Sequence, residues 1–93
     1  MKVTPDIIRY EFIGTEGKVA RSPHEYYVGL GGKVVGETKN TFTFLQEGQA
    51  KSVIKESVIF NFKFDDGTVV EIDGKLLVGR SEDRLKKNIK RLW

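Results

Sequence analysis

The sequence predicts a mainly β fold, a small antiparallel barrel of about six strands with a short N-terminal helix and a basic C-terminal helix. Three observations lead to this prediction. The 93 residues suffice for one small core, so residues 1–93 are expected to form a single domain. Between residues 18 and 78, short segments rich in β-branched or aromatic residues alternate with turn residues. Both ends of the chain instead carry the caps and spacing typical of helices.

A short helix is predicted near the N-terminus, between Thr4, which can cap its first turn, and Gly14, which can end it. The apolar side chains in this stretch are spaced to share one side of the helix. About ten residues are too few for a stable isolated helix, so it must dock on the protein's own core or on a partner. The simpler alternative is the core. The residues concerned are Ile7, Ile8, Tyr10 and Phe12.

The clearest strand is predicted at residues 58–64, where every second residue is Val or Phe and would face the core. The turn at Asp65–Thr68 would close a hairpin into a strand at residues 69–72. Asp73 and Gly74 would then close a second hairpin into a strand at residues 75–78. Shorter strands are predicted at residues 18–21, 33–35, 41–44 and 52–54.

Positive charge is concentrated at the C-terminus. The last 14 residues hold six Lys or Arg and two Asp or Glu, a net charge of +4, whereas the other 79 hold ten basic and eleven acidic residues. Ser81 can cap a helix in which Leu85, Ile89 and Leu92 form an apolar stripe. Basic side chains would fill the opposite side. A solvated helix surface explains such a side, but a polyanion would relieve its charge repulsion, and we favour contact with nucleic acid.

No catalytic or metal-binding constellation is recognisable in the sequence. His24 follows a proline in a predicted loop and has no second His or Cys with which to share a metal. Asp65 and Asp66 are neighbours in a turn, where carboxylates usually cap the turn. The glycines at residues 29–32 lie between strands and open no helix, so they favour a bend or bulge over a phosphate loop. We expect no catalytic residue, metal or cofactor in this chain.

Targeting signals are equally inconspicuous. The N-terminal residues contain no apolar run typical of a signal peptide, and nothing approaches the roughly 18 apolar residues of a membrane span. The chain contains no cysteine, which is compatible with a reducing compartment. We therefore expect a soluble, cytoplasmic protein with no membrane partner.

The segment GKVVGETKNT at residues 32–41 predicts a strand, a polar turn and a strand. Lys39 and Asn40 in the turn could meet a phosphate and a base edge, although an ordinary β-turn is the simpler explanation. Here the sequence resembles the archaeal ribonuclease P protein component 1 family, related to the eukaryotic Pop4 subunit. The resemblance covers nearly the whole chain and includes TPDIIRYEFIG at 4–14, VARSPH at 19–24, YVG at 27–29, GKVVxETKNT at 32–41, DGTVVEIDGKLLVGR at 66–80 and the helix at 81–91.

This resemblance implies an Sm-like or SH3-like barrel in a subunit of the ribonucleoprotein that removes the 5′ leader from precursor tRNA. The RNA of that enzyme carries out the metal-assisted cleavage, so a protein subunit without an active site is expected. The implied partners are the ribonuclease P RNA, a zinc-ribbon protein subunit, and precursor tRNA through the holoenzyme. The zinc-ribbon subunit would contact the N-terminal helix and its neighbouring strand, which would make Ile7, Ile8, Tyr10 and Phe12 a protein interface.

We expect RNA to bind along the last helix and across the barrel, where cations can neutralise phosphates. The helix would contribute Arg80, Arg84, Lys86, Lys87, Lys90 and Arg91. The barrel would add Lys18, Arg21, Lys33 and Lys39, with Asn40 and Thr41 as hydrogen-bonding members.

Two other classes of protein remain open. An SH3-like protein-interaction module would carry the last helix as a solvated surface, and an Sm-like RNA chaperone would form rings through a free edge strand. An independent metal-dependent nuclease fits least, because clustered carboxylates are missing. The sequence departs from the family pattern at Gly17, Gly31 and Gly36, each expected to weaken a strand by roughly 0.5–1 kcal/mol.

Overall fold

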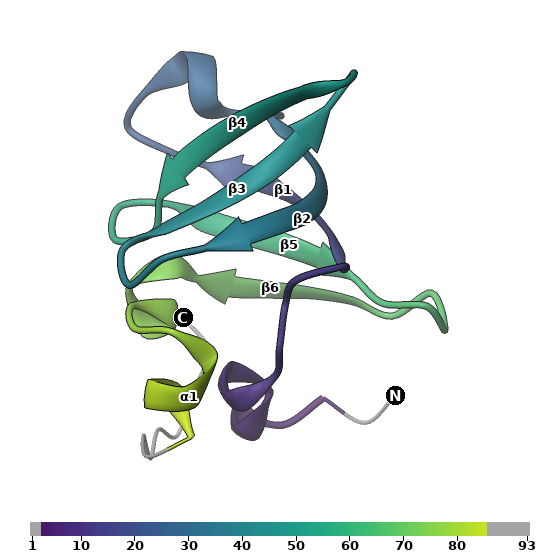
Figure 1. Cartoon of the computed structure of the whole chain (residues 1–93), viewed down its shortest axis with the longest axis vertical. Helices are drawn as coiled ribbons and strands as arrows, with labels where there is room; N and C mark the ends of the chain where they lie inside the picture. The colour runs from purple at the N-terminus through teal and green to yellow at the C-terminus, as the bar shows by residue number, and fades with distance from the viewer. Residues whose placement is uncertain (1–2, 86–93) are drawn as a thin grey trace.

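Six antiparallel strands form one sheet in the computed structural model, which describes residues 3–85 (Figure 1). Their order in the sheet is β4-β3-β2-β1-β5-β6. The strands are β1 (Glu16–Arg21), β2 (Gly31–Glu37), β3 (Thr41–Gln46), β4 (Gln49–Ile54), β5 (Ile59–Lys63) and β6 (Val69–Asp73). The helices described are three 3₁₀ helices, η1 (Pro5–Arg9), η2 (Glu25–Tyr27) and η3 (Gly74–Leu77), and one α-helical turn, α1 (Ser81–Arg84).

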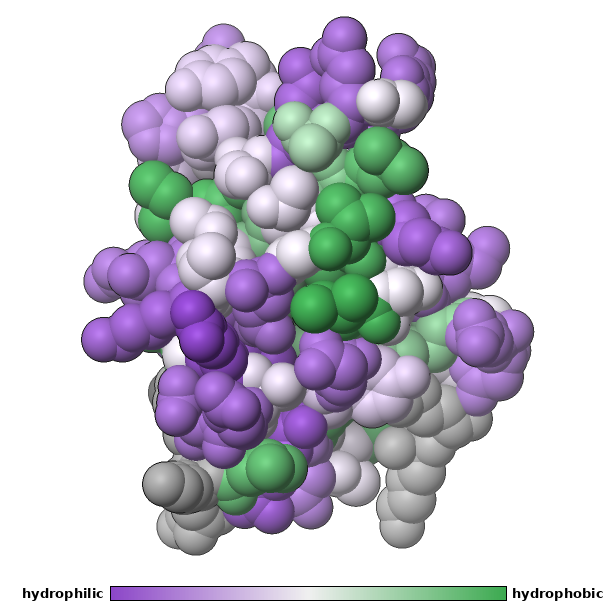
Figure 2. Space-filling view, viewed as in Figure 1, coloured by the Kyte–Doolittle hydropathy of each residue, from purple (hydrophilic) through white to green (hydrophobic). Residues whose placement is uncertain are grey.

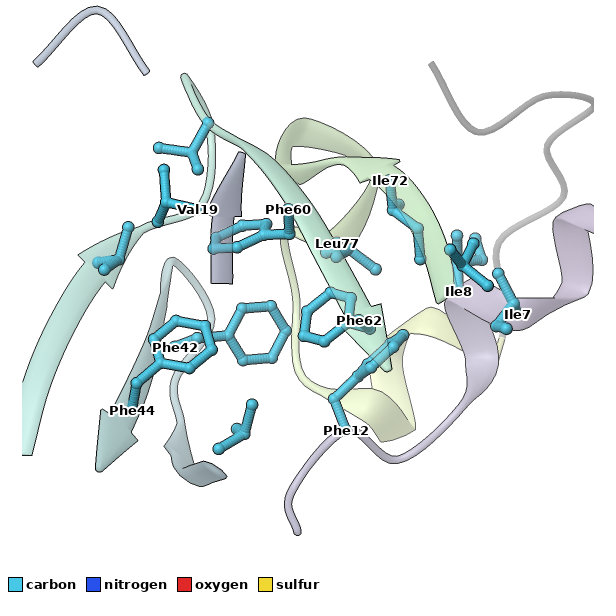
Figure 3. Close-up of a cluster of buried hydrophobic side chains, with 14 of the residues drawn as sticks. Ile7, Ile8, Phe12, Val19, Phe42, Phe44, Phe60, Phe62, Ile72 and Leu77 are labelled. Atoms are coloured by element: carbon cyan, nitrogen blue, oxygen red, sulfur yellow. The ribbon is translucent and has the colours of Figure 1, made fainter. Parts of the chain in front are cut away.

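The sheet curls around a single core, because every strand contributes buried side chains to the same hydrophobic cluster (Figure 3). This confirms the predicted mainly β, barrel-like fold. The strand residues of the cluster are Val19, Val34, Phe42, Phe44, Val53, Phe60, Phe62, Val70 and Ile72.

Phenylalanine rings fill the centre of this core. The alternation predicted around β5 is confirmed, since Val58, Phe60, Phe62 and Phe64 are all buried. Ring centroids lie 4.5 Å apart for Phe12 and Phe62, so the chain before β1 also supplies the core. Aromatic pairs of this kind contribute about 0.5–1.5 kcal/mol beyond the area that they bury.

The N-terminal segment forms a 3₁₀ helix that ends at Arg9, shorter than the predicted helix. Thr4 precedes it in extended conformation and makes no side-chain cap. Ile7, Ile8 and Phe12 are 6%, 1% and 0% exposed. The expectation that these three residues form a protein interface is therefore wrong. Their side chains are buried in the core of this chain and are not available at its surface.

The strand predicted at residues 75–78 is absent and is replaced by η3. The Asp73 carboxylate accepts a hydrogen bond from the Lys75 backbone N–H at 3.1 Å, which caps the turn. Gly74 lies so close to the carbonyl oxygens of Lys55 and Val58 that no side chain would fit there. The chain therefore turns inward and buries Leu77. The other predicted strands and the Asp65–Thr68 turn are confirmed.

Two of the glycines that depart from the family pattern permit close packing. A Cβ at Gly17 would lie 2.8 Å from the Phe62 ring, and one at Gly31 would overlap the Gly17 carbonyl oxygen and lie 2.5 Å from the Lys18 Cβ. Gly17 therefore leaves room for the Phe62 ring in the core, and Gly31 permits the close approach of β1 and β2. Gly36 differs, because it lies at a bulge between β2 and β3 with space around it.

The Gly31→Ala variant should lower the free energy of unfolding by about 1–3 kcal/mol, because the added methyl would overpack the β1–β2 contact. Urea denaturation measures this change. Gly36→Ala is the matched control, since its Cβ would meet the Thr43 Cβ at an ordinary 3.6 Å. The control should change stability by no more than about 0.5 kcal/mol. Equal effects of both variants would contradict the role given to Gly31.

Candidate functional site

Three lysines gather on the outer face of the barrel. Gly17 and Val19 of β1 face the core, so the alternate residues Glu16 and Lys18 face outward. Glu16 pairs with Lys33 of β2 on one side and with Lys63 of β5 on the other. We call the set Lys18, Lys33 and Lys63 the lysine face.

Two adjoining grooves run along the lysine face, with Glu16 and Lys63 common to both. The first, of about 460 Å³, is lined by Lys18, Asn61 and several glycines of β1 and β2. The second, of about 520 Å³, is lined by Lys33. Three cations and two carboxylates, those of Glu16 and Asp65, lie around these grooves and give a local charge of +1. Such a surface attracts polyanions, and its backbone and amide groups could hydrogen-bond to them.

Lys63 and Asn61 were not among the predicted RNA-binding residues. The signal was nevertheless present in the sequence, because the alternation at residues 58–64 places every odd-numbered residue outward. What the sequence lacked was the strand order. Pairing of β1 with both β2 and β5 is what brings Lys63 beside Lys18 and Lys33.

Arg21 lies at the other end of β1 and does not join the lysine face. Its guanidinium donates a hydrogen bond to the Glu71 carboxylate of β6 at 2.8 Å. Both side chains are well exposed to solvent, so the ion pair contributes at most about 1 kcal/mol. The pair reduces the charge that Arg21 offers to a ligand.

A second basic group lies at the turn between β2 and β3. Lys39 and Asn40 are exposed there. The Lys39 carbonyl oxygen accepts a hydrogen bond from the Gly79 N–H at 2.7 Å, which holds exposed Arg80 close to the turn. Thr41 is half-buried, and its hydroxyl is hydrogen-bonded to that of Thr38 at 2.7 Å, so it shapes the turn.

A buried ion cluster lies directly beneath this turn. The Glu37 carboxylate is 4% exposed and binds the ammonium of Lys55 at 2.7 Å and the guanidinium of Arg84. Both cationic side chains are 0% exposed. We call Glu37, Lys55 and Arg84 the ion cluster.

The expectation that Arg84 faces outward and contacts RNA is wrong. Its guanidinium donates hydrogen bonds to the carbonyl oxygens of Ile8 at 2.6 Å, Leu77 at 3.1 Å and Tyr10 at 3.3 Å. Together with the Glu37 carboxylate, these acceptors offset the free-energy cost of removing the guanidinium charge from water. Arg84 therefore links α1 to the N-terminal segment.

Lys55 anchors the basic turn from below. Besides Glu37, its ammonium donates to the carbonyl oxygens of Thr38 and Gly79, each at 2.9 Å, and it lies 4.5 Å from the centre of the Phe42 ring. No local sequence pattern indicates that this lysine is buried. Its position ties β4 to the β2–β3 turn and to the segment before α1.

The predicted C-terminal helix is described only as far as Leu85. Leu85 is 60% exposed, so the expectation that it packs on the barrel is wrong. Ser81 is the first helical residue and not the cap, and its hydroxyl donates to the Glu11 carboxylate at 3.0 Å. The predicted contacts Lys86, Lys87, Lys90 and Arg91 lie outside the described residues, as do Ile89 and Leu92.

A third surface is apolar. Val35 of β2, Leu45 of β3 and Ile54 of β4 are 44%, 44% and 54% exposed. Figure 2 shows hydrophobic atoms on the face that these strands form. Leu45 pairs with Ala50 at one end of the β3–β4 ladder, and Ile54 pairs with Thr41 at the other. Exposed apolar side chains that share a face can form contacts with other proteins. The barrel therefore presents two chemically different outer faces.

Within residues 3–85, no group of three His, Cys, Asp or Glu side chains is placed to hold a metal ion. The same residues contain no helix that is long and apolar enough to cross a bilayer. Asp66 accepts a hydrogen bond from the Thr68 N–H at 3.0 Å, which confirms that this carboxylate caps its turn.

The fold and its surface define a small antiparallel β-barrel protein with a basic outer face, a class that contains many RNA-binding modules. More particularly, the chain belongs to the family described as ribonuclease P/MRP, subunit p29, which matches residues 5–87. This membership confirms the family to which the sequence motifs pointed.

Individual relatives agree with this family. The chain is 41% identical over 91 residues to the ribonuclease P protein component 1 of Methanothermobacter thermautotrophicus, covering 96% of this chain and 98% of the relative. It is also 41% identical to that of Methanocaldococcus jannaschii, covering 98% and 97%. A solved structure described as Mth11, a homologue of human RNase P protein Rpp29, has a TM-score of 0.60 at 41% identity, over 81% of this chain and 97% of that one.

Replacing Glu37 by Gln should lower the free energy of unfolding by about 3–5 kcal/mol, because two buried cations would lose their carboxylate. Denaturant titration monitored by circular dichroism measures the loss. Glu71→Gln is the matched control, since it removes a carboxylate from the exposed pair with Arg21 and should change stability by at most about 1 kcal/mol. Similar small losses in the two variants would show that the ion cluster is not required for stability.

Proposed function

We propose that this protein is an RNA-binding subunit of ribonuclease P and that the lysine face is its principal RNA contact. The observation that carries the proposal is the convergence of Lys18, Lys33 and Lys63 from three neighbouring strands around open grooves. Family membership and the names of the relatives support the assignment to ribonuclease P.

Binding would proceed mainly through phosphates. Lysine ammonium groups neutralise phosphate charge and release counterions, which provides affinity that depends steeply on salt. The second basic group, Lys39, Asn40 and Arg80, would extend the contact toward the C-terminal residues. The protein would hold the catalytic RNA in its working fold, while the metal-assisted cleavage of precursor tRNA stays with the RNA.

Residues 1–93 would act as one RNA-binding domain, in the cytoplasm, and precursor tRNA would be reached through the holoenzyme. The protein would correspond to the eukaryotic Pop4 subunit and would pair with a zinc-ribbon subunit of ribonuclease P. Of the four residues first expected at that protein interface, Tyr10 is the one with a large exposed fraction, 43%. The apolar face of β2, β3 and β4 adds area that suits a protein partner.

Replacing Lys63 by Ala should weaken binding to ribonuclease P RNA and reduce the slope of log affinity against log salt by about one unit, because one phosphate contact is lost. A salt titration of binding, with an unrelated structured RNA of equal length as competitor, measures both effects. Lys75→Ala removes the same charge from η3, outside both basic groups, and should leave the slope unchanged. If the two variants behaved alike, the lysine face would not be the contact.

Replacing Tyr10 by Asp should reduce affinity for a zinc-ribbon subunit of ribonuclease P at least tenfold, since exposed aromatic residues often dominate protein interfaces. Co-purification and calorimetric titration measure this loss. Val69→Asp places the same charge at a residue on β6 that is 60% exposed and serves as the control. Unchanged pairing of a folded Tyr10→Asp variant would contradict this part of the proposal.

A further inference from the structure

An exposed aromatic cluster is formed by Tyr26 and Tyr27 of η2 and by His24, which precedes this helix. Tyr26 is 76% exposed, the largest exposure among the large hydrophobic side chains of residues 3–85. Its ring centroid lies 4.7 Å from that of Tyr27 and 6.2 Å from that of His24. Covering this aromatic surface with a ligand would be favourable.

The backbone holds this cluster in a fixed orientation. The Tyr27 N–H donates to the His24 carbonyl oxygen at 3.0 Å, and the Ser22 hydroxyl accepts a hydrogen bond from the His24 N–H at 3.1 Å. Tyr27 itself packs against the hydrophobic core. A hydrogen bond with the Tyr26 side chain raises the pKa of the Tyr27 hydroxyl. The exposed ring of Tyr26 is therefore supported from beneath by an anchored neighbour.

A groove of about 570 Å³ adjoins the cluster, with Tyr26 and Tyr27 on one wall. The other wall comes from β3 and β4 and includes Gln46, Lys51 and Ser52. This wall offers an amide, a hydroxyl and one cation beside an aromatic surface. An aromatic platform next to hydrogen-bonding groups and a cation is the arrangement by which proteins bind unpaired nucleotides.

We infer that Tyr26 forms a stacking site for an unpaired base of single-stranded RNA, with Lys51 beside the adjoining phosphate and Gln46 or Ser52 at the base edge. This inference rests on the proposed function as an RNA-binding protein and extends it from charge neutralisation to recognition of unpaired segments. A double helix keeps its bases stacked on each other, so it cannot use this site. The lysine face would contact the phosphates of both single-stranded and double-stranded RNA.

The test compares binding of the full-length chain to an oligouridine of about 12 nucleotides and to a duplex RNA of the same length. Tyr26→Ala should weaken oligouridine binding by about 5- to 150-fold and leave duplex binding and the salt slope unchanged, because no charge is removed. Tyr26→Phe should keep the affinity, since its ring still stacks. Ile54→Ala, which shortens an apolar side chain that is 54% exposed on β4, should bind as the unmodified protein does.

The outcomes separate this inference from the function on which it rests. Undiminished oligouridine binding by Tyr26→Ala, together with a reduced salt slope for Lys63→Ala, would overturn the stacking site and leave RNA binding in place. Equal weakening toward both RNAs would also overturn it, because stacking requires unpaired bases. If Tyr26→Ala lost binding to another protein subunit but kept its RNA binding, the cluster would be a protein contact and the stacking site would be overturned. Absence of binding to either RNA by the unmodified protein would overturn both proposals.

Discussion

The buried contact of Glu37 with Lys55 and Arg84 is the constraint on which the arrangement of the whole chain depends. Its members come from β2, from the residue that follows β4, and from α1. Through the backbone acceptors of Arg84 and Lys55, the cluster also holds the N-terminal segment and the β2–β3 turn. A barrel of this size has a small core, so a few buried ionic contacts determine how its terminal segments dock.

The two basic groups are positioned by different internal contacts. The turn that carries Lys39 and Asn40 is held from beneath by Lys55, and Arg80 is held close to it by the contact between Gly79 and Lys39. The lysine face depends instead on the close approach of β1 and β2, which the glycines permit. Core packing and surface chemistry are therefore coupled: the residues that present cations to solvent are positioned by residues that never meet the ligand.

Strands and turns that depend on local sequence pattern are predicted correctly. Alternation identified β5 and its inward phenylalanines, and turn residues identified the hairpin into β6. The predictions are wrong where contacts between segments distant in the sequence determine the structure. Helical spacing alone predicts that Arg84 faces solvent. Spacing within one helix contains no information about Glu37, which lies 47 residues away in the sequence and binds Arg84. The segment after Asp73 was expected as a strand, but the carbonyl oxygens of Lys55 and Val58 close the space beside Gly74. Lys63 was missed because strand order is not a local property.

The partners of Arg84 have a consequence for how this protein can change during evolution. Apart from the Glu37 carboxylate, the acceptors of its guanidinium are backbone carbonyl oxygens, which every residue possesses. Substitutions at Ile8, Tyr10 or Leu77 therefore leave these acceptors in place, provided that the path of the chain is kept. The link between the two ends of the protein demands a specific residue on one side only. Sequences could diverge widely around it while α1 stays joined to the segment around η1.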